Sequence, residues 1–324
     1  MKIDILMATY NGEKYLKEQI DSILEQTNQD FRLLISDDMS TDNTRAILND
    51  YVSTDNRVVV FLQNKNLGPV KNFEYLMKKV ESSYFMFADQ DDIWQKDKIE
   101  QSVRKLEETN SDLVYTNLQV VNENLDVMYP SYWKLKGFEK KAKKFHHFES
   151  LYLNNYITGC TMLVKSKWID KILPLPQKSN YILHDYWTAL VVSKFGKIDF
   201  IEKPLVKYRQ HVNNRIGSKR KSDEIKEFEE MRNLFIEVKL DHFKTFLQNI
   251  DVFEDDAMKQ VTKEAYQYFT DLKNHKKLQR KQIQLFWELY QYENIRYRLE
   301  NFLILNMPSL AKPLFQIKKG LKKG

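Results

Sequence analysis

Three carboxylates within four residues form the segment best suited to chemistry. Asp89, Asp91 and Asp92 directly follow the apolar segment Tyr84 to Ala88, which has the composition of a buried strand. Carboxylates this close repel one another at neutral pH unless a cation lies among them. Hard cations such as Mg²⁺ bind carboxylate oxygens and keep positions open for phosphate oxygens. The pattern therefore favours a cation and phosphate site over the alternative, a solvated acidic turn.

A second acidic pair, Asp37 and Asp38, ends an earlier apolar run. Ser40 or Thr41 could cap a helix that begins here, which explains the hydroxyl residues but not the two acids. A carboxylate at this position could accept a hydrogen bond from the ring N–H of uracil or thymine. The pair is therefore a candidate for binding a nucleotide base.

Asp185 follows His184 and precedes the apolar stretch Tyr186 to Val192. The helix dipole favours an acid in the first turn of a helix, so Asp185 has a structural explanation. A carboxylate there could equally take the proton from an attacking hydroxyl group. Both interpretations stay open from these residues alone.

A basic segment, residues 203–221, has seven Lys or Arg and no acid. Such a run is usually a solvated surface, and a lone histidine such as His211 is more often structural than a ligand. Arg209 and Arg215 nevertheless offer charges that could neutralise a departing diphosphate. We expect residues 213–222, which include Gly217, to form a lid that orders over a bound ligand.

The elements that must position these residues alternate between strands and helices. Strands are predicted at Ile3 to Ala8, Phe31 to Ser36, Val58 to Gln63 and Tyr84 to Ala88, and helices at Thr41 to Tyr51 and Val70 to Val80. This order predicts an α/β domain with a mainly parallel sheet. Ligands bind outside the carboxyl ends of the strands in such sheets, which is where the polar clusters lie.

The composition is that of a globular protein. Its 324 residues are 42% apolar and 30% charged, with a net charge of +6. The single cysteine, Cys160, excludes an internal disulfide and is interpreted as a buried packing residue. No apolar stretch reaches the roughly 18 residues of a spanning helix, and no signal peptide is recognised, so a cytosolic protein is expected.

The strand pattern gives way to charged helical segments near Asp223. We predict a first domain at residues 1–220, a helical domain at 221–305 and a basic amphipathic tail at 306–324. One long helix is expected to carry the apolar stripe of Leu285, Leu289, Tyr292, Leu299 and Leu303. The tail has five lysines and no acid, and we expect it to touch the inner face of the plasma membrane without crossing it.

Taken together, four motifs closely resemble the family 2 glycosyltransferases with a GT-A fold, and among them the rhamnosyltransferase-like enzymes of bacterial surface polysaccharide assembly. They lie at residues 8–12, 37–42, 66–73 and 87–94, in family order and at family spacing. The resemblance covers roughly residues 1 to 215. It implies a Rossmann-like α/β domain and an inverting, metal-dependent transfer of a sugar to an acceptor hydroxyl.

The resemblance also implies a role for residues at the positions that bind the nucleotide. Thr9, Tyr10 and Asp38 match positions that hold the base, with the Tyr10 ring able to stack on it. Lys71 matches a basic position near the diphosphate, and Asp89 matches a carboxylate that commonly faces the ribose or the sugar.

Metal and catalytic roles follow in the same way. Asp91 matches the ligand of Mg²⁺ or Mn²⁺, and His211 a diphosphate or metal contact in some relatives. Asp185 matches the catalytic base, although the family often has Glu where this chain has His184. The implied donor is a dTDP- or UDP-sugar, and the implied acceptor is lipid-linked or a polysaccharide. No nucleic-acid partner is expected.

Two other functions stay open from the sequence. A nucleotidyltransferase also uses aspartates and Mg²⁺ on an α/β sheet, but it usually has a glycine-rich phosphate loop, and Gly12 is the only early glycine here. A non-catalytic nucleotide-sugar-binding partner of another transferase would not need both Asp91 and Asp185.

Overall fold

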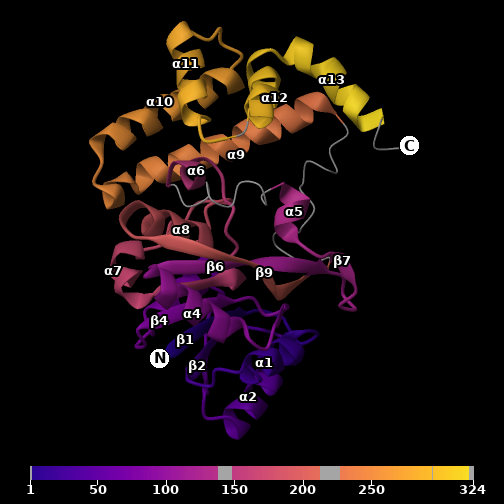
Figure 1. Ribbon diagram of the computed structural model, residues 1–324, viewed down its shortest axis with the longest axis vertical. Helices are drawn as coiled ribbons and strands as arrows, with labels where there is room; N and C mark the ends of the chain where they lie inside the picture. Colours follow the sequence, from indigo (N-terminus) through magenta and orange to yellow (C-terminus); the bar gives the residue numbers. More distant parts are fainter. Residues whose placement is uncertain (1, 138–147, 212–226, 294, 321–324) are drawn as a thin grey trace. The chain divides into compact units, whose positions relative to one another are not determined.

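The computed structural model describes residues 2–137, 148–211, 227–293 and 295–320. The chain forms two compact units (Figure 1). The first comprises Met1–Gln177 and Leu183–Ser218, and the second comprises Lys178–Ile182 and Lys219–Gly324. The domain boundary that we predicted at residue 220 lies outside the described residues, as do Arg215 and the proposed lid.

The first unit is built on one mixed sheet. In the described residues its strand order is β3-β2-β1-β4-β8-β6-β9-β5, with β7 paired to β6. The strands are β1 (Ile3–Thr9), β2 (Phe31–Asp37), β3 (Val58–Leu62), β4 (Tyr84–Ala88), β5 (Ile93–Trp94), β6 (Leu113–Val121), β7 (Val127–Tyr129), β8 (Met162–Lys165) and β9 (Ile198–Arg209). The first four strands are parallel, β8 is antiparallel to β4 and β6, and β9 runs parallel beside β6.

Helices cover both faces of this sheet. They are α1 (Leu16–Leu24), α2 (Thr44–Thr54), α3 (Pro69–Met77), α4 (Lys98–Thr109), α5 (Tyr132–Lys136), α6 (Phe148–Leu153), α7 (Ile169–Ile172) and α8 (His184–Phe195), with short 3-10 turns η2 (Gly159–Thr161) and η3 (Ser166–Trp168). Ile20 of α1, Leu48 of α2 and Leu106 of α4 pack in one core with Ile5 and Leu33 of the sheet. On the other face α3 contacts β1, β2 and α8. Side chains alternate along each strand, so a strand buried on both faces is apolar throughout.

The predicted elements of the first unit agree with the structure to within a few residues at most ends. The four strands begin at the predicted residues. The helix predicted from Thr41 begins instead at Thr44, and its N-cap is Asn43. Neither Ser40 nor Thr41 caps it, because the Ser40 hydroxyl donates to the Asp37 carboxylate.

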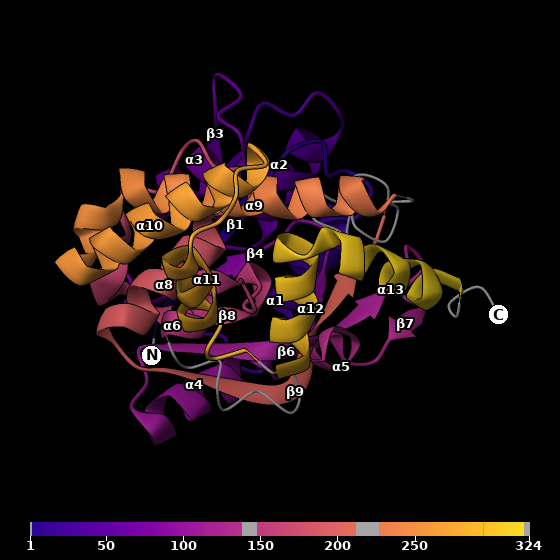
Figure 2. The ribbon, with the colours of Figure 1, turned by 90° about the horizontal axis from the view of Figure 1, so that it is seen from above.

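The second unit is helical. It contains α9 (Phe228–Gln248), η5 (Ile250–Phe253), α10 (Asp256–Lys273), α11 (Arg280–Leu289), α12 (Ile295–Asn306) and α13 (Pro308–Gly320). Helices α9 and α10 lie side by side (Figures 1 and 2). Stacked aromatic rings join them, with Phe243 of α9 on Phe269 of α10 at a centroid distance of 5.6 Å.

Two predictions about this unit are wrong in detail. The single helix expected across Leu285 and Leu299 is two helices, because the Gln291 and Glu293 N–H groups bond three residues back and end α11. Leu299 is 47% exposed and so does not belong to a buried stripe. Pro308 is the first residue of α13, a position that suits proline, and Pro313 lies within the same helix.

None of the helices in the described ranges combines the length and the hydropathy that crossing a bilayer requires.

Candidate active site

The polar segments after β1, β2 and β4 meet at one edge of the sheet. Thr9 pairs with Asp37 across β1 and β2, and Met7 pairs with Ala88, the last residue of β4. Because the three strands are parallel and in register, their carboxyl ends are neighbours. The residues just after them therefore share one site, as the sequence pattern predicted.

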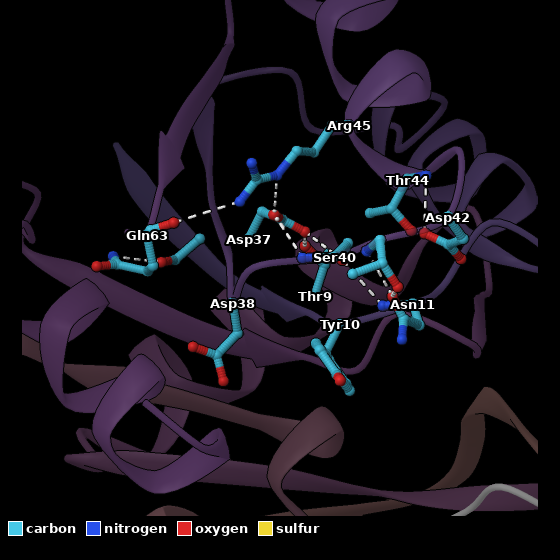
Figure 3. Close-up of polar contacts among 12 residues, drawn as sticks. Thr9, Tyr10, Asn11, Asp37, Asp38, Ser40, Asp42, Thr44, Arg45 and Gln63 are labelled. Atoms are coloured by element: carbon cyan, nitrogen blue, oxygen red, sulfur yellow. Dashed lines mark hydrogen bonds and ion pairs between the residues drawn. The ribbon is translucent and has the colours of Figure 1, made fainter. Parts of the chain in front are cut away.

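Asp37 fixes the shape of the loops at this edge (Figure 3). Its carboxylate accepts from the Thr9 hydroxyl at 3.3 Å, from the Ser40 N–H at 3.1 Å and from Arg45 Nε at 2.7 Å. The Asn11 N–H in turn donates to Ser40 Oγ at 2.9 Å. Asp37 is fully buried, so its role is to hold the loops after β1 and β2.

Asp38, the next residue, connects β2 with the start of α3. Its two carboxylate oxygens accept from the Leu67 N–H at 2.6 Å and the Gly68 N–H at 2.8 Å. Gly68 has φ of 75°, which only glycine adopts at low cost, and it is the N-cap of α3. Each carboxylate oxygen has two acceptor directions, so Asp38 keeps capacity for a further donor.

Tyr10 offers an aromatic surface beside Asp38 (Figure 3). Its side chain is 49% exposed, and its main chain is held at both ends by Gln90. The Tyr10 N–H donates to Gln90 Oε1 at 2.9 Å, and Gln90 Nε2 donates to the Tyr10 carbonyl at 3.2 Å. Gln90 thus links the loop after β1 to the acidic loop after β4.

The acidic loop brings Asp91 to His211. His211 Nε2 lies 2.7 Å from Asp91 Oδ2, although 120 residues separate them in the sequence. The loop is held through both its main chain and a side chain, because Gln19 Nε2 donates to the Asp89 carbonyl at 2.9 Å and the Arg209 N–H donates to the Asp92 carboxylate Oδ1 at 3.2 Å. Both residues that we predicted as metal ligands are therefore side by side.

The pKa values of Asp89 and Asp92 are raised, because both carboxyl groups are buried and lie close to other negative charges. Burial, together with the charges of Asp91 and Asp185, raises the pKa of Asp89 to about 7. Burial and the charges of Asp89 and Asp91 raise the pKa of Asp92 well above its usual range. A divalent cation would relieve this repulsion, since it favours the ionised form of every nearby carboxylate.

Two sets of donor atoms could hold that cation. Asp89, Asp92 and Cys160 each offer an atom within 4.8 Å of the others, but Asp92 and Cys160 are fully buried and a thiol is a poor ligand for Mg²⁺ or Mn²⁺. Asp91 and His211 retain partial exposure. The Asp91 and His211 pair, with Asp89 beside it, fits a hard cation that must also reach a substrate.

Asp185 is the second residue of α8 and faces the same site. Its Oδ2 accepts from the Gly159 N–H at 3.1 Å and its Oδ1 from the Tyr186 N–H at 2.7 Å. Gly159, which donates to Asp185, is followed by Cys160, whose sulfur lies within 4.8 Å of donor atoms of Asp89 and Asp92, so Asp185 lies near the acidic loop. The helix-start and active-site interpretations of Asp185 are therefore compatible.

His184 packs in the core. Its ring stacks on Phe73 at a centroid distance of 3.8 Å and meets the edge of Phe87 at 4.7 Å. The His184 ring packs well against these aromatic rings, which explains why histidine is accommodated where the family that the sequence resembles often has Glu.

Arg209 has a different role from the predicted one. It is 2% exposed, and its guanidinium donates to the Asp91 carbonyl at 2.9 Å, to the Glu123 carbonyl at 2.7 Å and to the Glu18 carboxylate. Because its guanidinium already binds three acceptors, Arg209 supports the acidic loop and does not face a diphosphate. Lys71, by contrast, is an exposed residue in the first turn of α3.

Sequence reasoning missed several residues that build this site. Gln90 and Gln19 hold the loops of the site through side-chain amide contacts, which no sequence motif predicts. Lys98 is fully buried with Nζ 3.4 Å from the centre of the Trp94 ring, and burial lowers its pKa to about 7. A lysine at a helix start is normally solvated, so no sequence signal reveals it. Cys160 is buried as predicted, but it also adjoins Asp89 and Asp92.

Comparison with known proteins places this fold in a defined class. The Staphylococcus aureus TarS structure, residues 1–349 in complex with UDP-GlcNAc, superposes with a TM-score of 0.59 at 18% identity, over 94% of this chain and 87% of that one. PcManGT from Pyrobaculum calidifontis, a mannosyltransferase in complex with GDP-Man and Mn²⁺, gives a TM-score of 0.53 at 13% identity, over 93% and 83% of the two chains. The first unit therefore has the GT-A glycosyltransferase fold.

The sequence identifies the family. Residues 4–173 match the model of glycosyl transferase family 2. The dTDP-rhamnosyl transferase RfbG of Shigella flexneri is 34% identical over 223 residues, which are 65% of this chain and 74% of that protein. The putative teichuronic acid biosynthesis glycosyltransferase TuaG of Bacillus subtilis is 28% identical, over 67% and 81% of the two chains. The chain belongs to glycosyl transferase family 2.

Proposed function

We propose that the protein transfers a sugar from a nucleotide diphosphate donor to an acceptor hydroxyl, with inversion and with a divalent metal, in capsule or cell-wall polysaccharide assembly. The observation that carries this proposal is the convergence of Asp91 with His211 beside Asp89, in a site that Asp185 also faces. This set supplies a cation site and a separate carboxylate base.

Asp91 and His211 would hold the metal, Mg²⁺ or Mn²⁺. When bound, the metal neutralises the charge that develops on the departing nucleotide diphosphate. The chain's own residues prepare this place, since Arg209 and Gln19 fix the main chain of the acidic loop before any ligand arrives. PcManGT is in complex with Mn²⁺ as well as GDP-Man, which supports Mn²⁺ as the first ion to test.

Asp185 would act as the base. The acceptor oxygen attacks the anomeric carbon on the face opposite the diphosphate, and its proton passes to Asp185. One carbon–oxygen bond forms while the bond to the diphosphate breaks, and the diphosphate leaves with the electron pair. A single displacement of this kind inverts the anomeric centre. Because two main-chain N–H groups hold the Asp185 carboxylate, it is oriented in advance.

The nucleotide would lie against Tyr10, with Thr9 and Asp38 near the base and Lys71 near the diphosphate. The exposed Tyr10 ring and the remaining acceptor capacity of Asp38 support this placement. The relative RfbG is a dTDP-rhamnosyl transferase, and the structural neighbour TarS is in complex with UDP-GlcNAc. These similarities support a dTDP- or UDP-sugar, with rhamnosyl transfer as the first candidate.

The acceptor would be lipid-linked or a polysaccharide, reached at an anionic membrane surface. Met307, at the start of the tail, and Leu310 and Leu314 of α13 are exposed at spacings of three and four residues, and Lys312 is exposed beside them. No acidic residue follows Glu300. An apolar stripe with lysines suits shallow insertion at the inner face of a membrane.

Incubation with a panel of dTDP-, UDP- and GDP-sugars, with Mn²⁺ or Mg²⁺, tests this function without the acceptor. We expect slow hydrolysis of one donor and, by proton NMR, first release of the sugar with inverted configuration. Release with retained configuration would contradict the single displacement. Tight binding of a donor with no turnover in the presence of membranes bearing acceptor would favour a non-catalytic binder.

A further inference from the structure

Gly159 holds one oxygen of the proposed base. It is the first residue of η2, and its N–H donates to Asp185 Oδ2 at 3.1 Å. The other oxygen accepts from the Tyr186 N–H within α8. Gly159 is therefore the contact that fixes Asp185 from outside its own helix.

The position is tight for a side chain. A Cβ at Gly159 would lie 3.0 Å from Asp185 Cβ, 3.3 Å from His184 Nε2 and 3.5 Å from Asp185 Oδ2. His184 cannot give way easily, because its ring is stacked on Phe73 and bounded by Phe87. A Cβ at residue 159 would therefore push against Asp185, which would have to shift by a few tenths of an ångström.

The same turn also touches the metal side of the site. Cys160, the next residue, has its sulfur within 4.8 Å of donor atoms of Asp89 and Asp92. The Thr161 hydroxyl donates to the Thr158 carbonyl at 2.6 Å and closes the turn. Two consecutive residues of η2 thus contact the base and the acidic loop.

We infer that Gly159 is a positioning residue of the transfer reaction, which sets Asp185 in place relative to the Asp89 to Asp92 loop. This inference rests on the proposed role of Asp185 as base. Residue 159 should therefore be glycine, because a Cβ would crowd Asp185 where the Gly159 N–H approaches its carboxylate.

Gly159→Ala is the direct test. We expect kcat to fall by about 10- to 100-fold, because small displacements of a catalytic group cost this much. Donor KM and the metal concentration for half-activation should change by no more than about twofold, since neither ligand contacts residue 159 in the proposed arrangement. An unchanged kcat would overturn the inference.

Gly196→Ala is the matched control at the other end of α8. A Cβ there would lie 2.6 Å from Trp168 Cζ2 and 2.7 Å from Asp112 Oδ2, so the crowding is tighter than at Gly159 but involves residues other than Asp185. We expect a lower Tm with kcat per folded molecule unchanged. Equal loss of kcat in both variants would mean that Gly159 matters only for folding.

A double-mutant cycle with Asp185→Asn separates this inference from the proposed function. If Gly159 acts through Asp185, Gly159→Ala should cost nothing further in the Asp185→Asn background. Additive losses would overturn the positioning role while leaving Asp185 as the base. An active Asp185→Asn enzyme would instead overturn the proposed base. Should Gly159→Ala fail to fold, Phe73→Leu loosens the His184 stack and enters the same cycle with the same expectation.

Discussion

At the scale of single residues, the site gathers buried carboxylates whose negative charges are unfavourable without a cation. Asp89 and Asp92 repel each other and Asp91, and the structure around them supplies main-chain donors and Arg209 beneath the loop. Such an arrangement is poor for stability without a ligand. It is well suited to a cation that brings a phosphate group with it.

Asp185→Asn tests the base at this scale. Asn keeps the size of the side chain and the helix start but cannot accept a proton. We expect donor affinity to stay nearly unchanged, while the rate falls by about two to four orders of magnitude. Calorimetric titration with donor and single-turnover kinetics measure the two quantities. A variant that mainly unfolds, with a normal rate per folded molecule, would show that Asp185 serves only the helix.

The sequence predicted some of these residues and not others, for physical reasons. Asp91 lies in an acidic segment at a strand end, where the pattern favours a cation site, whereas the role expected of His211 came from the family resemblance. Arg209 was misjudged because nothing in a basic run shows which of its cations a strand will bury. Lys98 was missed because only the packed structure places its amine over Trp94.

At the scale of elements, the first strand is anchored at the end of the sheet opposite the site. Asp4 of β1 pairs with Arg32 of β2 through two contacts of 2.8 Å. It also accepts from the Glu81 and Ser82 N–H groups just before β4. One buried carboxylate thus joins three neighbouring elements.

Asp4→Asn should therefore lower stability without changing catalysis. Burial raises the pKa of Asp4, but the hydrogen bonds from Arg32, Ser82 and Glu81 outweigh it and leave the pKa lowered. A carboxyl with a lower pKa in the folded protein stabilises it above the unfolded pKa of about 4, and this contribution is lost as the pH falls through the folded pKa.

We expect Asp4→Asn to reduce the free energy of unfolding by about 3 kcal/mol at pH 7, as for other broken buried ion pairs. The loss should be smaller at pH 3, because the carboxyl of the unfolded chain, with a pKa of about 4, is largely protonated there and part of the ionic contribution is lost. Urea unfolding at both pH values measures it, with donor turnover as the control. An equal loss at the two pH values would contradict the ionic contribution.

The early elements were predictable and the later ones were not. Strands such as β1 and β4 are short apolar runs that end at polar clusters, and a single pattern identifies them. The break between α11 and α12 has no such signal, because Tyr290 to Tyr292 contains neither Gly nor Pro. The residues between the two helices favour a helix, so the turn there is determined by tertiary packing and not by the local sequence.

At the scale of the whole molecule, a basic apolar tail forms the last part of the helical unit, and none of the described helices could span a membrane. The exposed side chains of Met307, Leu310 and Leu314 would otherwise stay in contact with water. Lysines near an anionic surface contribute about 1 kcal/mol each, and salt screens this attraction.

Removal of residues 308–324 should therefore abolish binding to anionic vesicles. The full-length protein should sediment with vesicles that contain phosphatidylglycerol at low salt, and less so as salt rises. Neutral vesicles are the control for the charge. If the full-length protein ignores anionic vesicles at low salt, the tail belongs to the fold or to a protein partner.

Donor turnover in metal-free buffer, followed by addition of Mn²⁺ or Mg²⁺, is the most direct test of a metal-dependent glycosyltransferase. With the donor found in the nucleotide-sugar panel, we expect no turnover in excess chelator and recovery when metal is restored. Asp91→Ala should stay inactive after metal is added and should bind the donor more weakly than the wild type. Full turnover by the wild-type protein in excess chelator would contradict the proposed metal site and the mechanism built on it.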